Sequence, residues 1–481
     1  MRMNVRLNSK MGVLVMALVL AACAAPPPPA ADSTAQALPA QWPGRADCAA
    51  SAAVTADWWR SFGSAELDAL VRQAQAQSLD VAAAVARVQQ AGAAARIAGA
   101  ALLPEVNASL NASRQQRLGG NASVAGNVLG AGLNASYEID FWGRNRADRD
   151  SALATLQASA FDRDTLQLSV TAAVATAWLQ AVALAERSAI GESNLQSAAR
   201  LLALVESRVR AGAATPLELA QQRGLIAAQR RGVAALRQQQ GEARSALALL
   251  LGQAGGAPPA TTTLAALQAP SIAAGLPAEL LTRRPDIARA EAQLAAADAN
   301  LRAARAALLP RLTLTGGIAS GGDALRRVFD NPAYSLAAGL AAPIFDAGRL
   351  AAGRDFAQAR REELLARYRA AIVAAFADAE VALNAMAGVA AQSAAQAEEL
   401  AQAQRALTLA ERRYRAGADS LLTLLDAQRT LYAAQDAAVQ LQAQGLQASV
   451  ALYKALGGGW TRAADAAAVA VNSTTLEGLT P

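Results

Sequence analysis

Hydrophobic residues recur at alternating intervals of three and four along two long stretches of the chain. The two seams are Leu195, Ala198, Leu202, Val205 and Val209, and Leu400, Ala403, Leu407, Ala410 and Tyr414. Such a seam is typical of coiled-coil helices. Residues 144–210 and 349–415 contain no proline, so each stretch predicts one helix about 100 Å long. The alternative is several shorter helices, broken at Gly191, or at Gly353 and Gly388.

Each long helix is followed by a turn and a second apolar helix. Gly212 and Gly417 follow the last helical turn, where a left-handed residue commonly ends a helix. Thr215 and Ser420 then stand at positions suited to the N-cap of the next helix. The pattern predicts two long antiparallel helical hairpins.

Four other segments alternate between polar and apolar residues with a period of two. They cover 105–113, 128–139, 311–315 and 334–342. Alternation over about 10 residues fits a tilted membrane-spanning strand, although a half-buried strand of a soluble sheet gives the same pattern. Four strands cannot close a membrane barrel, so the chain must oligomerise. Two copies would give eight strands and three copies twelve, and the alternation does not choose between them.

The chain consists of two tandem repeats of one structural unit, offset by 205 or 206 residues. The stretch 101–104 returns at 307–310, and 210–213 returns at 415–418. A repeat of this length indicates a tandem duplication with pseudo-symmetry.

The first residues have the pattern of a bacterial lipoprotein signal. Residues 1–22 combine basic residues with a short apolar run and end in Leu-Ala-Ala before Cys23. That run is too short for a membrane helix and fits a signal peptide. An ordinary signal peptide with a chance cysteine is the alternative. Cys23 is the predicted lipid attachment site, and the prolines of 26–29 predict a stiff tether. Cys48 is given no role.

Composition argues against an enzyme. Hydrophobic residues make up 53% of the chain but aromatic residues only 4%, and histidine is absent. Neither a histidine base, nor a cysteine-rich metal site, nor a phosphate-binding glycine loop can be built. No cofactor is expected. The net charge of +6 falls to +3 without the three basic residues of the signal peptide, and no basic patch indicates nucleic-acid binding.

Several motifs resemble the TolC-like outer membrane factors of tripartite efflux pumps, in their NodT-type lipoprotein branch. The resemblance covers Trp58 to Trp460. It is carried by Leu-Pro-Ala-Glu-Leu-Leu-Thr-Arg-Arg-Pro-Asp-Ile at 276–287, Tyr-Glu-Ile-Asp-Phe-Trp-Gly-Arg at 137–144 and Pro-Ile-Phe-Asp-Ala-Gly-Arg at 343–349.

The resemblance implies a mainly α fold with a membrane β-barrel. A homotrimer would form a 12-stranded barrel in outer membrane lipid, continuous with a 12-helix periplasmic coiled-coil tunnel. A periplasmic adaptor and an inner membrane transporter, expected to be proton-driven, would supply small molecules such as drugs. The implied domains are the signal peptide 1–22, an anchored tether and equatorial segment 23–65, repeats 66–252 and 285–457, an equatorial linker 253–284 and a tail 458–481.

The resemblance also implies two kinds of site at the hairpin ends. A periplasmic gate would use Leu422, Asp426 and Arg429, although without the family the last two fit a solvated helical pair. This chain has Thr423 where some members carry a second aspartate, which weakens the case for cation selectivity. The adaptor would dock at the tips, whose residues are Arg210, Gly212, Thr215, Leu217, Arg415, Gly417, Ser420 and Leu422.

Two other functions fit the same patterns. One is an exit duct for a secreted polypeptide, which keeps the fold and changes the cargo. The other is a lipid-anchored coiled-coil scaffold without a pore. Conduction in planar bilayers separates a channel from a scaffold.

Overall fold

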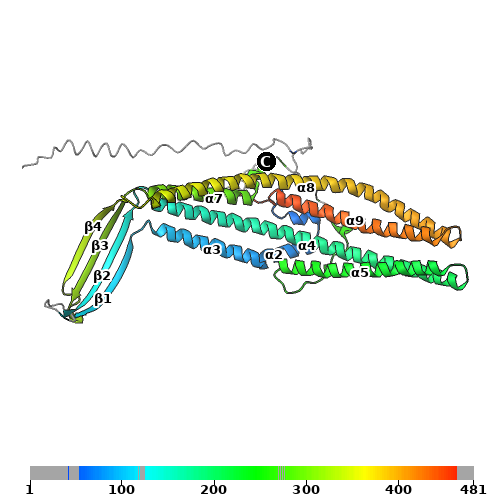
Figure 1. Ribbon diagram of the computed structural model, residues 1–481, viewed down its shortest axis with the longest axis horizontal. Helices are drawn as coiled ribbons and strands as arrows, with labels where there is room; N and C mark the ends of the chain where they lie inside the picture. The colour runs from blue at the N-terminus through cyan, green and yellow to red at the C-terminus, as the bar shows by residue number, and fades with distance from the viewer. Residues whose placement is uncertain are drawn as a thin grey trace, which may run out of the picture. The chain divides into compact units, whose positions relative to one another are not determined.

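The computed structural model describes residues 42, 54–116, 119, 125–268, 270, 272, 275 and 277–462. Figure 1 shows long helices that run side by side and a sheet that continues from one end of them. The elements are η1 Trp58–Phe62, α2 Ala65–Gln77, α3 Leu79–Ala100, β1 Glu105–Gln116, β2 Ala125–Ile139, α4 Arg144–Arg210, α5 Pro216–Leu250, η2 Leu264–Ala266, η3 Pro277–Glu279, α6 Leu280–Arg283, α7 Pro285–Ala306, β3 Arg311–Gly322, η4 Leu325–Arg327, β4 Pro332–Ala341, α8 Arg349–Arg415 and α9 Leu421–Ala455.

The two predicted repeats are present and have matching dimensions. Helices α3 and α7 each have 22 residues, α4 and α8 each have 67, and α5 and α9 each have 35. The two long helices run unbroken through Gly191, Gly353 and Gly388. The predicted long helices are therefore confirmed, and the alternative of shorter, broken helices is wrong.

The four strands form one antiparallel sheet in the order β1-β2-β3-β4. Its register places apolar residues beside apolar residues across the strands. Leu110 lies opposite Ala131, and Leu133 lies opposite both Ala108 and Ile318. On the other face Asn107 lies opposite Asn134. The alternation predicted from the sequence thus produces one apolar and one polar face.

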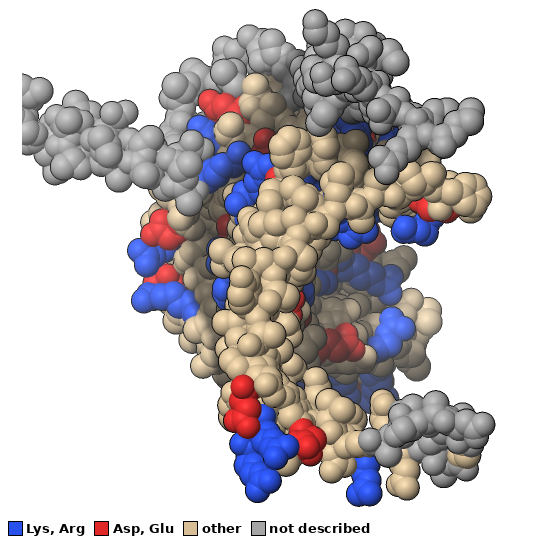
Figure 2. Space-filling model, turned by 90° about the vertical axis from the view of Figure 1, so that its left-hand side faces the viewer, with Lys and Arg blue, Asp and Glu red and all other residues tan. Residues whose placement is uncertain are grey.

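Charged residues are confined to the ends of these strands. Glu105, Glu138 and Arg311 lie where the strands meet the helices, and Arg114 lies near the far end. Seen from the sheet end, most of the strand surface in Figure 2 is free of charge. The apolar side chains are exposed in the single chain, as Leu110 at 85% and Leu336 at 82% illustrate. An exposed uncharged band is the surface that a membrane barrel turns toward lipid.

All four strands are longer than the alternation predicted, and β3 differs most. Strand β3 continues to Gly322, although 316–322 is rich in glycine and has little alternation. Its backbone pairs with β2 along this length, so pairing and not the side-chain pattern extends it. A Cβ at Gly317 would lie 2.6 Å from the Oδ1 of Asn134, so only glycine fits there without a shift.

Helix α4 lies at the centre of the helical part, in contact with α3, α5, α7 and α9. Its middle packs into one hydrophobic core, which we call the belt cluster and which includes Trp58, Phe62, Trp178, Leu264 and Tyr453. Among the described residues, α4 and α8 each contain a stretch long and apolar enough to cross a membrane. In α4, 61% of that stretch is buried against the rest of the protein, as in a core helix.

Several predictions fall on residues that are not described. The signal peptide 1–22, Cys23 and Cys48 lie outside the described residues, as do most of 23–65 and of 458–481. The division into domains at 22, 65, 252, 284 and 457 stays a prediction.

Candidate functional site

The two hairpin tips are built by the capping residues that the sequence predicted. Gly212 and Gly417 have φ of 69° and 74°, which is left-handed backbone that glycine adopts without strain. The amide of Gly212 donates to the carbonyl of Val209 at 3.0 Å, and that of Gly417 donates to Tyr414 at 3.0 Å. These bonds close the ends of α4 and α8 at equivalent points of the two repeats.

The helices that leave the tips begin at Thr215 and Ser420. Thr215 forms a capping box with Glu218: its Oγ1 accepts from the Glu218 amide at 3.2 Å, and its own amide donates to the Glu218 carboxylate at 2.7 Å. Ser420 accepts more weakly from the amide of Thr423, at 3.5 Å. Capping satisfies amides that would otherwise lack partners and fixes each tip as a compact turn.

The tip surface is exposed and partly apolar. Leu217 and Leu422 are 66% and 62% exposed, and Arg210 and Arg415 are also exposed. Among the described residues, and leaving aside the glycine and its chain neighbours, no heavy atom lies within 4 Å of the Cβ position at Gly212 or Gly417. The predicted tip residues therefore lie on accessible surface, where a partner could approach the backbone closely.

Helix α9 has two distinct faces next to its tip. Leu421, Leu424 and Leu425 are 1% exposed and pack against the first hairpin. Leu422, Asp426 and Arg429 lie on the opposite, exposed face. Within the described part of the single chain, no ion pair joins Asp426 to Arg429, so the role of these three residues as a gate stays a prediction.

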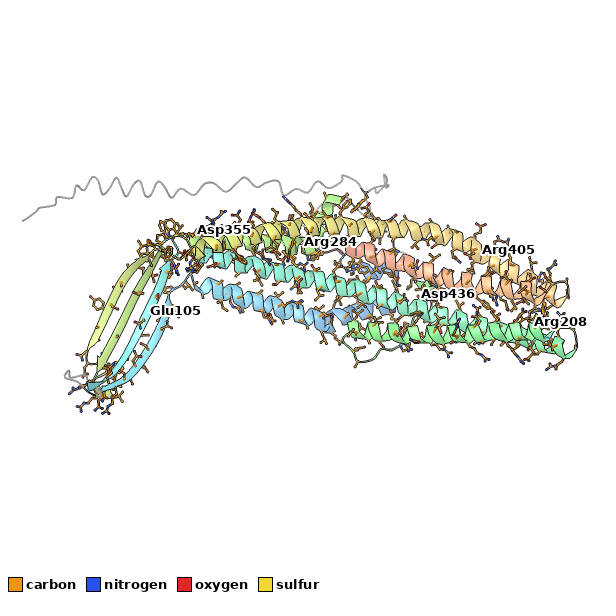
Figure 3. The ribbon with its side chains drawn as sticks, viewed as in Figure 1. Glu105, Arg208, Arg284, Asp355, Arg405 and Asp436 are labelled. Carbon is orange, nitrogen blue, oxygen red and sulfur yellow. The ribbon has the colours of Figure 1, made fainter. Side chains whose placement is uncertain are left out.

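The two hairpins are joined near their tips by a contact that sequence analysis missed. Arg208 of α4 donates from Nη1 to the carbonyl oxygen of Tyr414 at 2.8 Å. Its guanidinium carbon lies 4.7 Å from the centroid of the Tyr414 ring, a cation–π distance. Figure 3 places Arg208 at the tip end of the helices. Tyr414 had been identified only as a seam residue.

Further from the tips, toward the belt cluster, polar contacts join α4 to α9. Arg187 makes two hydrogen bonds to the Asp436 carboxylate, at 2.7 and 3.1 Å. The hydroxyl of Tyr432 donates to the carbonyl of Asn194 at 3.2 Å, and burial raises the pKa of Tyr432 to about 12. These contacts lie between the tips and the belt cluster, where Figure 3 labels Asp436.

Arg284 joins three helices beside the belt cluster, and we call this part of the helices the belt level. It is 8% exposed and donates to the carboxylates of Asp286 and Asp378, both at distances of 3.0 Å or less. Its Nη1 also donates to the carbonyls of Ala375 in α8 and Ala455 in α9. Burial acts to lower the pKa of Arg284, but hydrogen bonds to Asp286 and the two carboxylate charges outweigh it and raise the pKa. One guanidinium thereby fixes α7, α8 and α9 together.

A metal site was not predicted. In the part of the chain that the structure describes, no group of three or more His, Cys, Asp or Glu residues could hold a metal ion. The polar clusters described above are ion pairs and capping contacts.

Comparison with known proteins identifies the family of this fold. A family model described as outer membrane efflux protein matches residues 70–253 and 276–458. The pyoverdine export outer membrane protein OpmQ of Pseudomonas aeruginosa is 52% identical over 434 residues, which cover 88% of this chain and 92% of that protein. The cation efflux system protein CusC of Escherichia coli K12 is 34% identical, with 84% and 89% covered.

Solved structures agree with this assignment. A crystal structure of CusC has a TM-score of 0.80 at 30% identity and covers 88% of this chain and 97% of that chain. The open state of the Neisseria gonorrhoeae MtrE outer membrane channel has a TM-score of 0.80, also at 30% identity, with 88% and 96% covered. The predicted fold class is confirmed: mainly α, with four strands of a membrane barrel and two tandem repeats. The chain belongs to the outer membrane efflux protein family.

Proposed function

We propose that three copies of this chain form one channel, with a 12-stranded barrel and a 12-helix tunnel, which exports small molecules of the pyoverdine kind. As a family member, the chain is an outer membrane exit channel of a tripartite efflux system. Its copy number, cargo and partners are the parts proposed here.

The single observation that carries the trimer is the open sheet. In the described sheet, β1 and β4 each pair with a neighbour on one side only. Each unpaired backbone amide or carbonyl in lipid costs roughly several kcal/mol. A sheet edge has many such groups, so an open edge is not tolerated in the membrane. Three copies join β4 of one to β1 of the next and close twelve strands. Twelve strands leave an aqueous bore, whereas eight leave an interior filled by side chains.

The proposed cargo rests on the two OpmQ relatives. Both are named for pyoverdine export, at 51% and 52% identity over most of both chains. The relatives named for solvents or cations are about 34% identical or less. Higher identity along the whole length favours a shared cargo, so pyoverdine or a related small molecule is proposed first.

Complementation tests this cargo. A Pseudomonas aeruginosa strain without OpmQ would receive this chain, and pyoverdine in the medium would be measured against pyoverdine retained in the periplasm. We expect the chain to lower the periplasmic pool and raise the medium pool. Unchanged pools, with the chain present in the outer membrane, would contradict pyoverdine as cargo while leaving the channel itself intact.

The proposed partners are a periplasmic adaptor at the tips and an inner membrane transporter. Their support is the exposed Leu217 and Leu422 and the open space over Gly212 and Gly417. The sequence led us to expect a proton-driven transporter. Export that stops when the proton gradient is collapsed at constant ATP supports that expectation, and export that continues indicates an ATP-driven transporter.

The proposed attachment to outer membrane lipid includes acylation of Cys23, which rests on the lipoprotein motif alone. We expect radioactive palmitate to label the parent and not Cys23→Ser. Continued labelling of the variant would remove the proposal. The barrel would still hold the variant in the outer membrane.

A further inference from the structure

The helices α3, α4, α7 and α8 lie side by side in a layer next to the sheet. This layer has two different faces. One face is covered by residues 460–462. Trp460 donates from Nε1 to Asp164 at 3.0 Å and meets the Phe161 ring edge-on at 5.7 Å. Arg462 pairs with Glu291 of α7 on the same face. The belt cluster residue Trp178 continues this face of α4 further along.

The opposite face is hollowed. A cavity of about 420 Å³ lies there, lined by residues from all four helices. Among them are Arg87 of α3, Arg289 of α7, and Arg360 and Arg367 of α8, which we call the arginine cluster. Asp162 of α4 is the one carboxylate in the lining.

The arginine cluster carries more positive charge than its acidic partners neutralise. Arg87 and Arg289 share Asp162, at 3.5 and 2.7 Å. Arg360 and Arg367 both pair with Glu363 of their own helix. Four guanidinium groups therefore share two carboxylates, and each copy keeps two positive charges in excess.

These guanidinium groups are available to a solute. The side chains of Arg87, Arg360 and Arg367 are 52%, 48% and 64% exposed. The Nε of Arg289 is buried and finds no acceptor among the described residues. A planar fork with free donors is suited to a second carboxylate, which it can hold through two parallel hydrogen bonds.

In the trimer proposed above, the hollowed face would turn toward the tunnel axis. The belt segments 54–62, 264–266 and 460–462 pack on the other side of α4, and three copies of them inside the tube would obstruct the bore. With the covered face outside, three arginine clusters surround the axis at one level. Like charges around a narrow passage concentrate solutes of opposite charge.

We propose that the arginine cluster is a binding site in the tunnel for small organic anions that carry carboxylates. The proposal rests on the channel proposed above and adds the chemical class that the upper tunnel selects. Contacts at this exposure are individually weak. Weak, repeated contacts let a solute bind and still leave, which conduction requires.

Citrate is a suitable probe, because it is a small tricarboxylate. Its binding to the full-length, detergent-solubilised protein would be measured by equilibrium dialysis at low ionic strength. The test variant is Arg87→Gln with Arg367→Gln, which keeps the Arg289–Asp162 pair intact. The matched control is Arg96→Gln with Arg302→Gln. Arg96 lies nine residues from Arg87, and Arg302 lies nine from Gln293 of the cavity lining. Nine residues are about two and a half helical turns, so both control arginines lie on the opposite side of their helices.

We expect the parent and the control to bind citrate, and the test variant to bind about five to ten times more weakly. Salt at about 1 M should abolish the binding of all three. Absence of citrate binding by the parent, or equal binding by the test variant and the control, overturns the proposal. Conductance of the same preparations in planar bilayers tests the channel separately, since a conducting protein that ignores citrate refutes only the arginine cluster.

Discussion

The belt level and the hairpin tips are two parts of the same helices that are held in opposite ways. In the belt cluster, Val174, Trp178 and Leu179 of α4 are all fully buried, and Arg284 joins three helices. At the tips, only one face of each helix is buried and Leu217 and Leu422 remain exposed. Most of the α4 side chains at the belt are buried, whereas the tips keep one face of each helix exposed.

This difference suits the predicted gate, in which one end of the tunnel opens while the rest stays assembled. Aromatic packing and a buried ion network resist movement, because a well-packed core loses contacts on any displacement. Exposed ion pairs and single-sided packing allow helices to shift at little cost. The comparison therefore predicts large effects of substitution on stability at the belt and effects on conduction or docking at the tips.

The largest expected effect is at Trp58. Its ring is 2% exposed and stacks on Tyr453 at 4.9 Å. We expect Trp58→Ala to lower the free energy of unfolding by about 3–5 kcal/mol. Leu422→Ala, the matched apolar truncation at the tip, should change it by less than about 0.5 kcal/mol. Chemical denaturation followed by helical circular dichroism measures both free energies of unfolding. Equal losses in the two variants would contradict the difference between belt and tips.

Arg284 tests the polar half of the belt. Arg284→Met leaves Asp286 partly buried without its main partner, at a cost of about 3 kcal/mol or more. Arg283→Met is the neighbouring control, because its side chain is 41% exposed and should cost about 1 kcal/mol at most. The same denaturation measurement applies. If Arg283→Met proves the more damaging, Arg284 is not the residue that fastens this level.

At the tips, a bulky side chain should affect efflux by obstructing the adaptor, with little effect on stability. We expect Gly417→Trp to block efflux in a drug-susceptibility assay while surface level and trimer yield stay near those of the parent. Gly417→Ala is the control, because it brings the same left-handed strain of about 1–2 kcal/mol but little bulk. Resistance that survives Gly417→Trp would argue against docking at this tip.

The smallest structural change is expected at the predicted gate. Asp426→Ala with Arg429→Ala should raise single-channel conductance and admit large antibiotics, because only weak, exposed contacts would hold the predicted ring closed. Asp419→Ala with Arg413→Ala is the control, since that ion pair closes within one tip at 3.1 Å. Equal conductance in the gate variant and the parent would return Asp426 and Arg429 to an ordinary surface role.

Local periodicity made the tips and strands predictable from sequence. Period-two alternation identified both faces of the sheet, and Gly212 with Thr215 identified the turn, because each signal lies within a few residues. The belt cluster could not be found this way, since it joins Trp58 to Tyr453 across most of the chain. Arg284 lay in a recognised motif, but its partner Asp378 is 94 residues away, and no local pattern pairs them.

The copy number of the assembly is the most direct test of the account, because every function proposed here requires a closed bore. Native mass spectrometry of the detergent-solubilised protein measures it. We predict one complex of three copies that persists at low protein concentration. A stable monomer or dimer as the main species would contradict the twelve-stranded channel.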